Sequence, residues 1–147
     1  MLLAHDPFTN DLFVPQPNPD ARASRMSAIV LVDDEPDVLT ILHRVLRGLT
    51  AEHALTGVST GQAALELLDL FQVRLLITDY NMSGMDGLQL IQAVKNVSPE
   101  TQTVLITAYD SPDLRRRARA GSVDHYLAKP FALEQLEYIV DTALATP

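Results

Sequence analysis

The chain contains no cysteine, which excludes disulfide bonds, thiolate catalysis and cysteine-based zinc sites. It has no apolar run near the roughly 20 residues that a membrane-spanning helix needs. The first ten residues, MLLAHDPFTN, have neither a basic start nor an apolar segment of useful length, so we expect no signal peptide. Together these absences predict a cytoplasmic protein with no membrane contact.

Positive charge is scarce in this chain. Eleven Lys and Arg residues stand against 19 Asp and Glu, and the net charge of −8 argues against direct nucleic acid binding. This balance suits a protein that binds a cation or docks on a basic partner. Lys95 and Lys129 are the only lysines, so a site that requires a lysine must use one of these two.

The length of 147 residues suits one domain with a buried core. Residues 1–25 differ from the rest, because VPQPNPDARASR places three prolines within five positions and shows no sustained periodicity. We therefore expect a flexible N-terminal extension over residues 1–25 and a folded domain over residues 26–147.

From Met26 onward, short apolar runs alternate with helical patterns. The runs predict strands at 28–34, 52–59, 73–79, 102–108 and 123–128. The helical patterns cover 35–49, 60–71, 88–97, 111–121 and 132–145. Strict alternation with long connections predicts an α/β fold, a doubly wound five-stranded parallel sheet with five flanking helices.

Polar side chains stand where the predicted strands end. Asp33 and Asp34 end the first strand, Asp79 the third and Thr107 the fourth, while Lys129 follows the fifth. Ligands of open parallel sheets bind at the carboxyl ends of the strands, so we expect these side chains to meet at one edge.

The chemistry of this set is consistent with phosphoryl transfer. Three nearby carboxylates repel one another unless a divalent cation lies among them, and oxygen ligands suit Mg²⁺. A carboxylate beside Mg²⁺, a hydroxyl and a lysine can act as a nucleophile and become an aspartyl phosphate. Taken singly, Asp33 and Asp34 fit a helix cap equally well and Asp79 a loop acid. The set as a whole favours the magnesium site.

Four motifs, LVDDEP, LLITDYNMSGMDG, VLITAY and DHYLAKPF, give the chain a resemblance to the receiver domain of bacterial two-component response regulators. The resemblance covers residues 27–146. It implies a flavodoxin-like sheet with the strand order 2-1-3-4-5.

The resemblance also implies a role for each motif residue. Asp79 matches the phosphoryl acceptor, Asp34 a direct Mg²⁺ ligand, Asp33 a ligand acting through water, and Asn81 a ligand through its main-chain carbonyl. Thr107 and Lys129 match the switch hydroxyl and the phosphate-binding lysine, and Tyr126 matches the aromatic residue that turns inward with the threonine. Asn81 and Tyr109 match the positions that modulate phosphate lifetime. The Lys129–Pro130 bond falls where the family has a cis peptide.

Two stretches depart from the family pattern. Ser83 stands where many members have proline, and we expect it to loosen the loop after Asp79. Ser122 and Val123 replace a Gly-Ala pair, with Gly121 one place early, so we expect a rearranged start of the last strand.

The run RRRAR at residues 115–119 admits two interpretations. The simpler one is a solvated helix face. The other is a docking patch of Arg115, Arg116 and Arg119, because the helix at 111–121, the strand at 123–128 and the helix at 132–145 form the output surface in this family. An acidic protein partner or a symmetric homodimer suits such a patch; DNA does not.

The sequence thus predicts a single-domain response regulator that a histidine kinase or phosphotransfer protein phosphorylates on Asp79 with Mg²⁺. We expect no catalysis beyond its own phosphotransfer and autodephosphorylation. Because no segment follows residue 147, we expect the signal to leave through protein contact or a phosphorelay. A phosphorylation-independent module on the same fold is the alternative. A phosphohydrolase is disfavoured because Asn81 stands where such enzymes have a second carboxylate. Excision from a longer regulator stays open.

Overall fold

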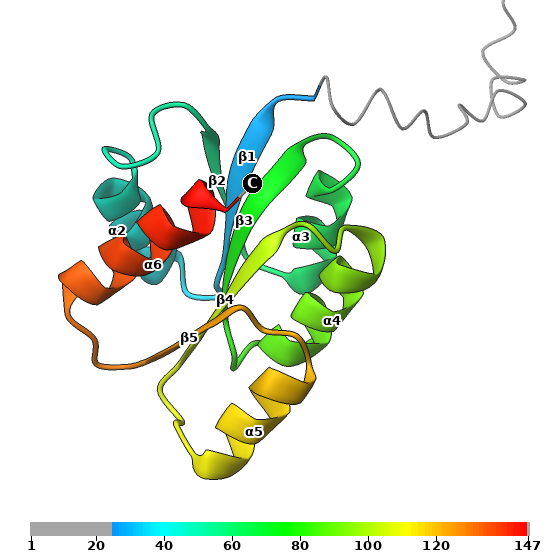
Figure 1. Cartoon of the computed structure of the whole chain (residues 1–147), viewed down its shortest axis with the longest axis vertical. Helices are drawn as coiled ribbons and strands as arrows, with labels where there is room; N and C mark the ends of the chain where they lie inside the picture. The colour runs from blue at the N-terminus through cyan, green and yellow to red at the C-terminus, as the bar shows by residue number, and fades with distance from the viewer. Residues whose placement is uncertain (1–24, 147) are drawn as a thin grey trace, which may run out of the picture.

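The structure, a computed structural model, describes residues 25–146 and forms one five-stranded sheet with helices on both sides (Figure 1). The elements run, in chain order, β1 (Ser27–Val32), α2 (Pro36–Leu46), β2 (Ala54–Val58), α3 (Gly61–Leu67), β3 (Gln72–Asp79), α4 (Gly87–Val97), β4 (Gln102–Thr107), α5 (Pro112–Ala120), β5 (His125–Ala128) and α6 (Leu133–Ala145). All neighbouring strands pair in parallel in the order β2-β1-β3-β4-β5. The predicted fold class and strand order are confirmed.

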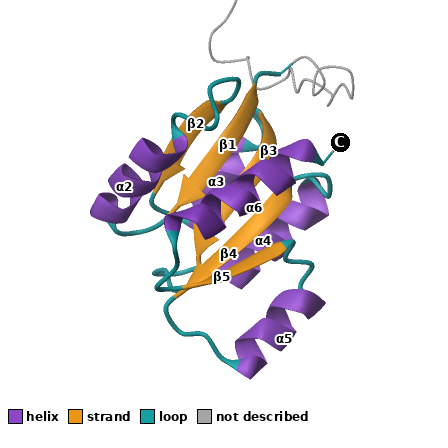
Figure 2. Cartoon of the chain, turned by 60° about the vertical axis from the view of Figure 1, so that its left-hand side comes forward, coloured by secondary structure: helices purple, strands orange, loops and turns teal. Residues whose placement is uncertain are grey.

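The helices divide into two layers. Figure 2 shows α2 and α6 in front of the sheet, with α3 and α4 behind it. Because successive side chains of a strand point to opposite faces, β1 supplies Ile29 and Leu31 to the α2 and α6 side, and Val30 and Val32 to the other. Both faces are therefore buried, which explains why β1 and β3 read as continuous apolar runs.

The observed ends of several elements differ from the predicted ones. β1 ends at Val32, so Asp33 and Asp34 lie just beyond it in the loop before α2. α3 ends at Leu67, four residues before the predicted end, because the next three amides bond to carbonyls three residues back and tighten the chain into a turn. Element ends are the part of a periodic pattern that local hydrogen bonding decides.

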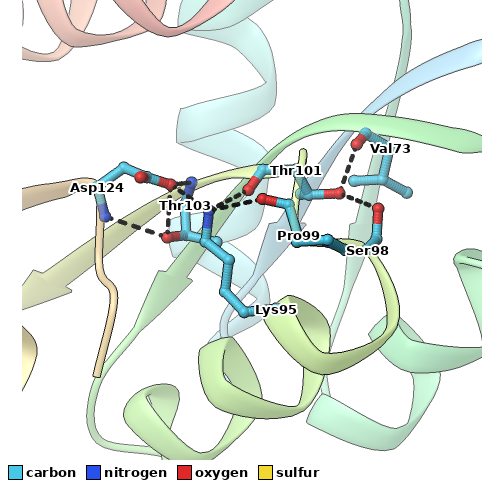
Figure 3. A network of polar contacts seen from close by, with 7 residues as sticks. All are labelled: Val73, Lys95, Ser98, Pro99, Thr101, Thr103 and Asp124. Atoms are coloured by element: carbon cyan, nitrogen blue, oxygen red, sulfur yellow. Dashed lines mark hydrogen bonds and ion pairs between the residues drawn. The ribbon is translucent and has the colours of Figure 1, made fainter. Parts of the chain in front are cut away.

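A polar network fastens the edge of the sheet opposite the predicted site (Figure 3). Lys95 Nζ lies 2.7 Å from Asp124 Oδ2 and donates to the carbonyl of Thr101, also at 2.7 Å. The same Asp124 oxygen accepts from the Thr103 amide at 2.8 Å. Thr101 Oγ1 in turn donates to the carbonyl of Val73. Lys95 thus joins α4 to the starts of β4 and β5, and of the two lysines only Lys129 is left for the site.

The last strand begins at His125, two residues later than the predicted start at 123. Ser122 has a positive φ of 64°, where the amide of Val123 bonds back to the carbonyl of Ala118. Asp124 is then held by Thr103 in the network rather than paired in the sheet. The expected rearrangement is therefore a left-handed turn at Ser122 followed by a shortened β5.

We predict that Ser122→Gly stabilises the protein by about 1 kcal/mol, because a left-handed backbone carries a steric cost for any residue with a Cβ. Urea unfolding of both proteins measures the difference. Ser59→Gly, the same change at an exposed serine without a positive φ, is the control and should bring no gain. Equal effects at the two serines would contradict the assignment.

None of the helices within residues 25–146 has the length and apolar character to cross a membrane. The predicted N-terminal extension lies outside the described residues except for Arg25, whose guanidinium donates to the carbonyl of Leu68 at 3.2 Å.

Candidate functional site

The carboxyl ends of β1, β3, β4 and β5 meet at one edge of the sheet, and this brings the predicted residues together. Asp79 is the last residue of β3, and Thr107 is the last of β4. The amide of Lys129 donates to the carbonyl of Thr107 at 2.7 Å, so the chain leaving β5 stays next to β4. The Lys129–Pro130 bond is cis, as predicted.

Asp79 lies at the centre of this edge and has two donors. Lys129 Nζ lies 3.2 Å from Asp79 Oδ1, and the amide of Asn81 donates to Oδ2, also at 3.2 Å. The main chain behind Asp79 packs directly on Gly87, where a Cβ would come within 2.4 Å of the Asp79 carbonyl oxygen. Glycine at position 87 therefore lets the start of α4 approach the acidic loop.

Asp33 is the most enclosed carboxylate of the site, with only 4% of its surface exposed. Its Oδ1 accepts from the Glu35 amide at 2.9 Å. Asp33, Asp79 and Lys129 line one side of a cavity of about 30 Å³, and the rest of the lining is apolar. Burial raises the pKa of the Asp33 carboxyl, and the charge of Asp79 raises it further, against the lowering effect of the Glu35 amide.

Asp34 is exposed and reaches the loop that follows β3. Its Oδ2 accepts from the amide of Ser83 at 3.3 Å. Proline, the common residue at this position of the family, has no amide hydrogen and could not make this bond. The sequence suggested that Ser83 loosens the loop, and here it gives the loop one more tie to the acidic pair.

Thr107 is 1% exposed, and its hydroxyl is used as an acceptor. The amide of Tyr109 donates to Thr107 Oγ1 at 2.9 Å. This contact couples the Thr107 side chain to the backbone of the loop between β4 and α5, while the ring of Tyr109 itself is exposed.

The ring of Tyr126 is held against α5 by two residues that the sequence did not single out as a pair. The Tyr126 hydroxyl donates to Asp110 Oδ1 at 2.9 Å, and the guanidinium carbon of Arg115 lies 4.7 Å from the ring centroid. Arg115 also binds Asp110 through two N–H···O bonds of 2.8 Å. Burial, followed by the bond to Asp110, raises the pKa of Tyr126 to about 12. The bonds from Arg115 and Tyr126 lower the pKa of the Asp110 carboxyl.

The arginines of the run at residues 115–119 make contacts in two different places. Arg115, Arg116 and Arg119 line one groove together with Asp110, Ser111 and Pro112, so the predicted patch is contiguous. Arg116 pairs with Asp113 on its own helix. Arg117 points elsewhere and donates to the hydroxyl of Tyr80 at 3.3 Å. This tie between α5 and the residue after Asp79 is a contact that no motif signals.

The three carboxylates among the four predicted metal ligands do not form a ready-made cluster. No group of three acidic or histidine side chains within the described range is arranged to hold a metal ion. Each carboxylate instead accepts hydrogen bonds from nearby donors. Asp33 accepts from Glu35 and Asp34 from Ser83. Asp79 accepts from both Asn81 and Lys129. The donor types still fit Mg²⁺, because the carboxylates of Asp34 and Asp79 and the carbonyl of Asn81 are hard oxygen ligands and Asp34 is open to water.

With this fold and site, the comparisons with known proteins agree on one class. The family model of the response regulator receiver domain matches residues 29–141. The heme response regulator HssR of Staphylococcus aureus (strain MRSA252) is 35% identical over 121 residues, which are 81% of this chain and 52% of that protein. This chain therefore spans about half the length of the curated relatives it matches.

Two solved structures are similar throughout the described domain. The signal receiver domain of an HD domain-containing protein from Pseudomonas fluorescens Pf-5 is 29% identical, with a TM-score of 0.73 over 82% of this chain and 88% of that one. The chemotaxis protein CheY4 of Vibrio cholerae is 25% identical, with a TM-score of 0.72 over 81% of this chain and 99% of that one. This chain belongs to the response regulator receiver domain family, the CheY-like receivers of two-component signalling.

We predict that Asp33→Asn stabilises the metal-free protein at pH 7, by about 1 kcal/mol on the usual scale of single substitutions. Because the Asp33 pKa is raised on folding, the folded chain holds this proton at pH values where the unfolded chain has released it. Ionisation above that range therefore costs stability, and asparagine removes the cost. Urea unfolding without divalent cations measures the change.

Asp37→Asn is the matched control for Asp33→Asn. It makes the same change of charge in the exposed first turn of α2. A negative side chain there interacts favourably with the helix dipole, so its loss should lower the stability slightly. A loss of stability for Asp33→Asn as well would contradict the conclusion that burial makes the ionised Asp33 carboxylate unfavourable.

Proposed function

We propose that this chain transmits a signal by accepting a phosphoryl group on Asp79 from a histidine kinase or phosphotransfer protein. The observation that carries the proposal is the pairing of Asp79 with Lys129 at 3.2 Å, beside the buried Thr107. A carboxylate with an adjacent ammonium and hydroxyl can attack phosphorus and then stabilise the charge that the transferred group brings.

In the proposed reaction a carboxylate oxygen of Asp79 forms a bond to phosphorus, while the bond from phosphorus to the donor imidazole nitrogen breaks. The imidazole nitrogen leaves with the electron pair and takes up a proton. Lys129 Nζ, now on Asp79 Oδ1, is placed to turn to a phosphoryl oxygen. Autodephosphorylation removes the phosphoryl group from Asp79: water attacks phosphorus, and the Asp79 carboxylate leaves. Asn81 and Tyr109, which flank the site, are the residues we expect to set its rate.

We assign Mg²⁺ to the same edge, with Asp34, Asp79 and the main-chain carbonyl of Asn81 as ligands and Asp33 acting through water. When bound, the ion supplies positive charge that offsets the repulsion among the carboxylates and the phosphoryl oxygens. Ser83 helps by holding Asp34 toward the loop after β3.

The proposed response is a shift between two arrangements of Thr107 and Tyr126. Thr107 Oγ1 turns from the amide of Tyr109 to the phosphoryl group, and Tyr126 leaves Asp110 for the space beside Thr107. This changes the surface of α5, β5 and α6, through which a downstream protein binds. Such a shift needs only a difference in the interactions of the phosphoryl group with the two arrangements. We place these events in the cytoplasm, without direct nucleic acid or membrane binding, and a homodimer would form through the same surface.

Intact-protein mass after incubation with Mg²⁺ and acetyl phosphate tests the proposal. Wild type should gain one phosphoryl group, and Asp79→Asn should gain none. Asp69→Asn, the same change at an exposed acid outside the site, should behave as wild type.

The rival function is a phosphorylation-independent interaction module on the same fold. Its mark would be no gain of mass in any variant, together with no effect of Mg²⁺ on stability. The presence of Asp34, Asp79, Thr107 and Lys129 at one edge of the sheet favours the phosphoryl-accepting function over this rival.

A further inference from the structure

We propose that the groove lined by Arg115, Arg116 and Arg119 binds an acidic segment of a partner protein, and that Asp110 occupies the Arg115 guanidinium as an internal substitute for that segment. This inference rests on the proposed function, because phosphorylation of Asp79 would control whether Asp110 releases Arg115. It adds the chemistry of the partner and the residue that blocks it.

The structure already contains one carboxylate bound at this place. Arg115 holds Asp110 with Nε on one oxygen and a terminal nitrogen on the other, both at 2.8 Å, which is the two-point geometry in which arginine recognises a carboxylate. Half of the Arg115 side chain is exposed, at 49%, so another carboxylate can approach the same guanidinium. Asp110 and Arg115 are part of the wall of a groove of about 430 Å³.

The charge of the groove is not balanced from within. Arg115 and Arg116 pair with Asp110 and Asp113, whereas Arg119 has no side-chain partner among residues 25–146. Arg119 also lines a second hollow of about 240 Å³ on the side of β5, together with Arg115 and with Asp124, whose carboxylate is already paired with Lys95. Displacement of Asp110 would therefore leave two arginines, one turn of α5 apart, facing a binding partner in a chain whose net charge is −8. An acidic, extended segment with several carboxylates matches this pattern.

The state of Asp79 reaches Asp110 through two contacts. Asp110 follows Tyr109, whose amide is bound to Thr107 Oγ1, so a turn of that hydroxyl toward a phosphoryl group releases the loop that carries Asp110. An inward turn of Tyr126 also removes the hydroxyl that donates to Asp110 and the ring that supports Arg115. Both changes weaken the hold of Asp110 on Arg115, and the guanidinium becomes available to the partner.

Binding of a fluorescein-labelled hexaglutamate peptide, measured by fluorescence anisotropy at low salt, tests the inference without phosphorylation. Asp110→Asn should bind the peptide about fivefold more tightly than wild type, the scale of one exposed carboxylate–arginine pair. Asp69→Asn, which changes the net charge equally outside the groove, is the matched control and should match wild type. Adding Arg115→Gln or Arg119→Gln to Asp110→Asn should abolish the gain, whereas adding Arg47→Gln, at the exposed residue just after α2, should not.

Equal affinity of Asp110→Asn and Asp69→Asn would overturn the proposal, and so would a gain that survives Arg115→Gln. Self-association of Asp110→Asn without a gain in peptide affinity would also overturn it, in favour of a second copy of the chain as the occupant. Wild type with Mg²⁺ and beryllofluoride should approach the affinity of Asp110→Asn. A failure of Asp79 phosphorylation alone would reject the proposed function, while the comparison of the unphosphorylated variants would still decide the role of Asp110.

Discussion

The site depends on one constraint, the parallel alignment of the strands. This alignment brings Asp79 and Lys129 together in the ion pair at the centre of the site. The two residues are 50 positions apart in the chain, and only the pairing of β3, β4 and β5 in one direction brings their ends within 3.2 Å. The same alignment places Thr107 on the strand between β3 and β5, and Asp33 lines the same small cavity as Asp79 and Lys129. Helices bury both faces of this sheet, so a slip by one residue would exchange side chains between two close-packed layers and disrupt the packing of both.

The opposite edge of the sheet shows how the same chemistry serves stability instead. Lys95 and Asp124 form an ion pair of 2.7 Å, but they are surrounded by backbone carbonyls, amides and hydroxyls that use the remaining donors and acceptors. At the carboxyl edge, Asp33 is enclosed by apolar walls and Asp34 is open to solvent. Asp124 accepts from Lys95 and from the amide and hydroxyl of Thr103, whereas a single main-chain amide binds each of Asp33 and Asp34, so these two carboxylates can accept a further ligand.

Much of this arrangement could be predicted from the sequence, because it follows from periodicity and from motifs at strand ends. The α/β fold class, the convergence of Asp79, Thr107 and Lys129, and the arginine patch are of this kind, whereas the strand order came from the family resemblance that the four motifs carry. The tie between Ser83 and Asp34 and the turn at Ser122 depend on backbone dihedrals that no pattern encodes. The hold of Asp110 on Arg115 and Tyr126 depends on side-chain rotamers in the folded protein, and Asp110 is one acid among 19.

We propose that Asp79, among all the carboxylates of the chain, receives the phosphoryl group. Borohydride reduction converts an aspartyl phosphate to homoserine, so peptide mass mapping after phosphorylation and reduction locates the acceptor residue. We expect homoserine at position 79 alone. Homoserine at position 33 or 34, or at an acid outside this edge of the sheet, would contradict it.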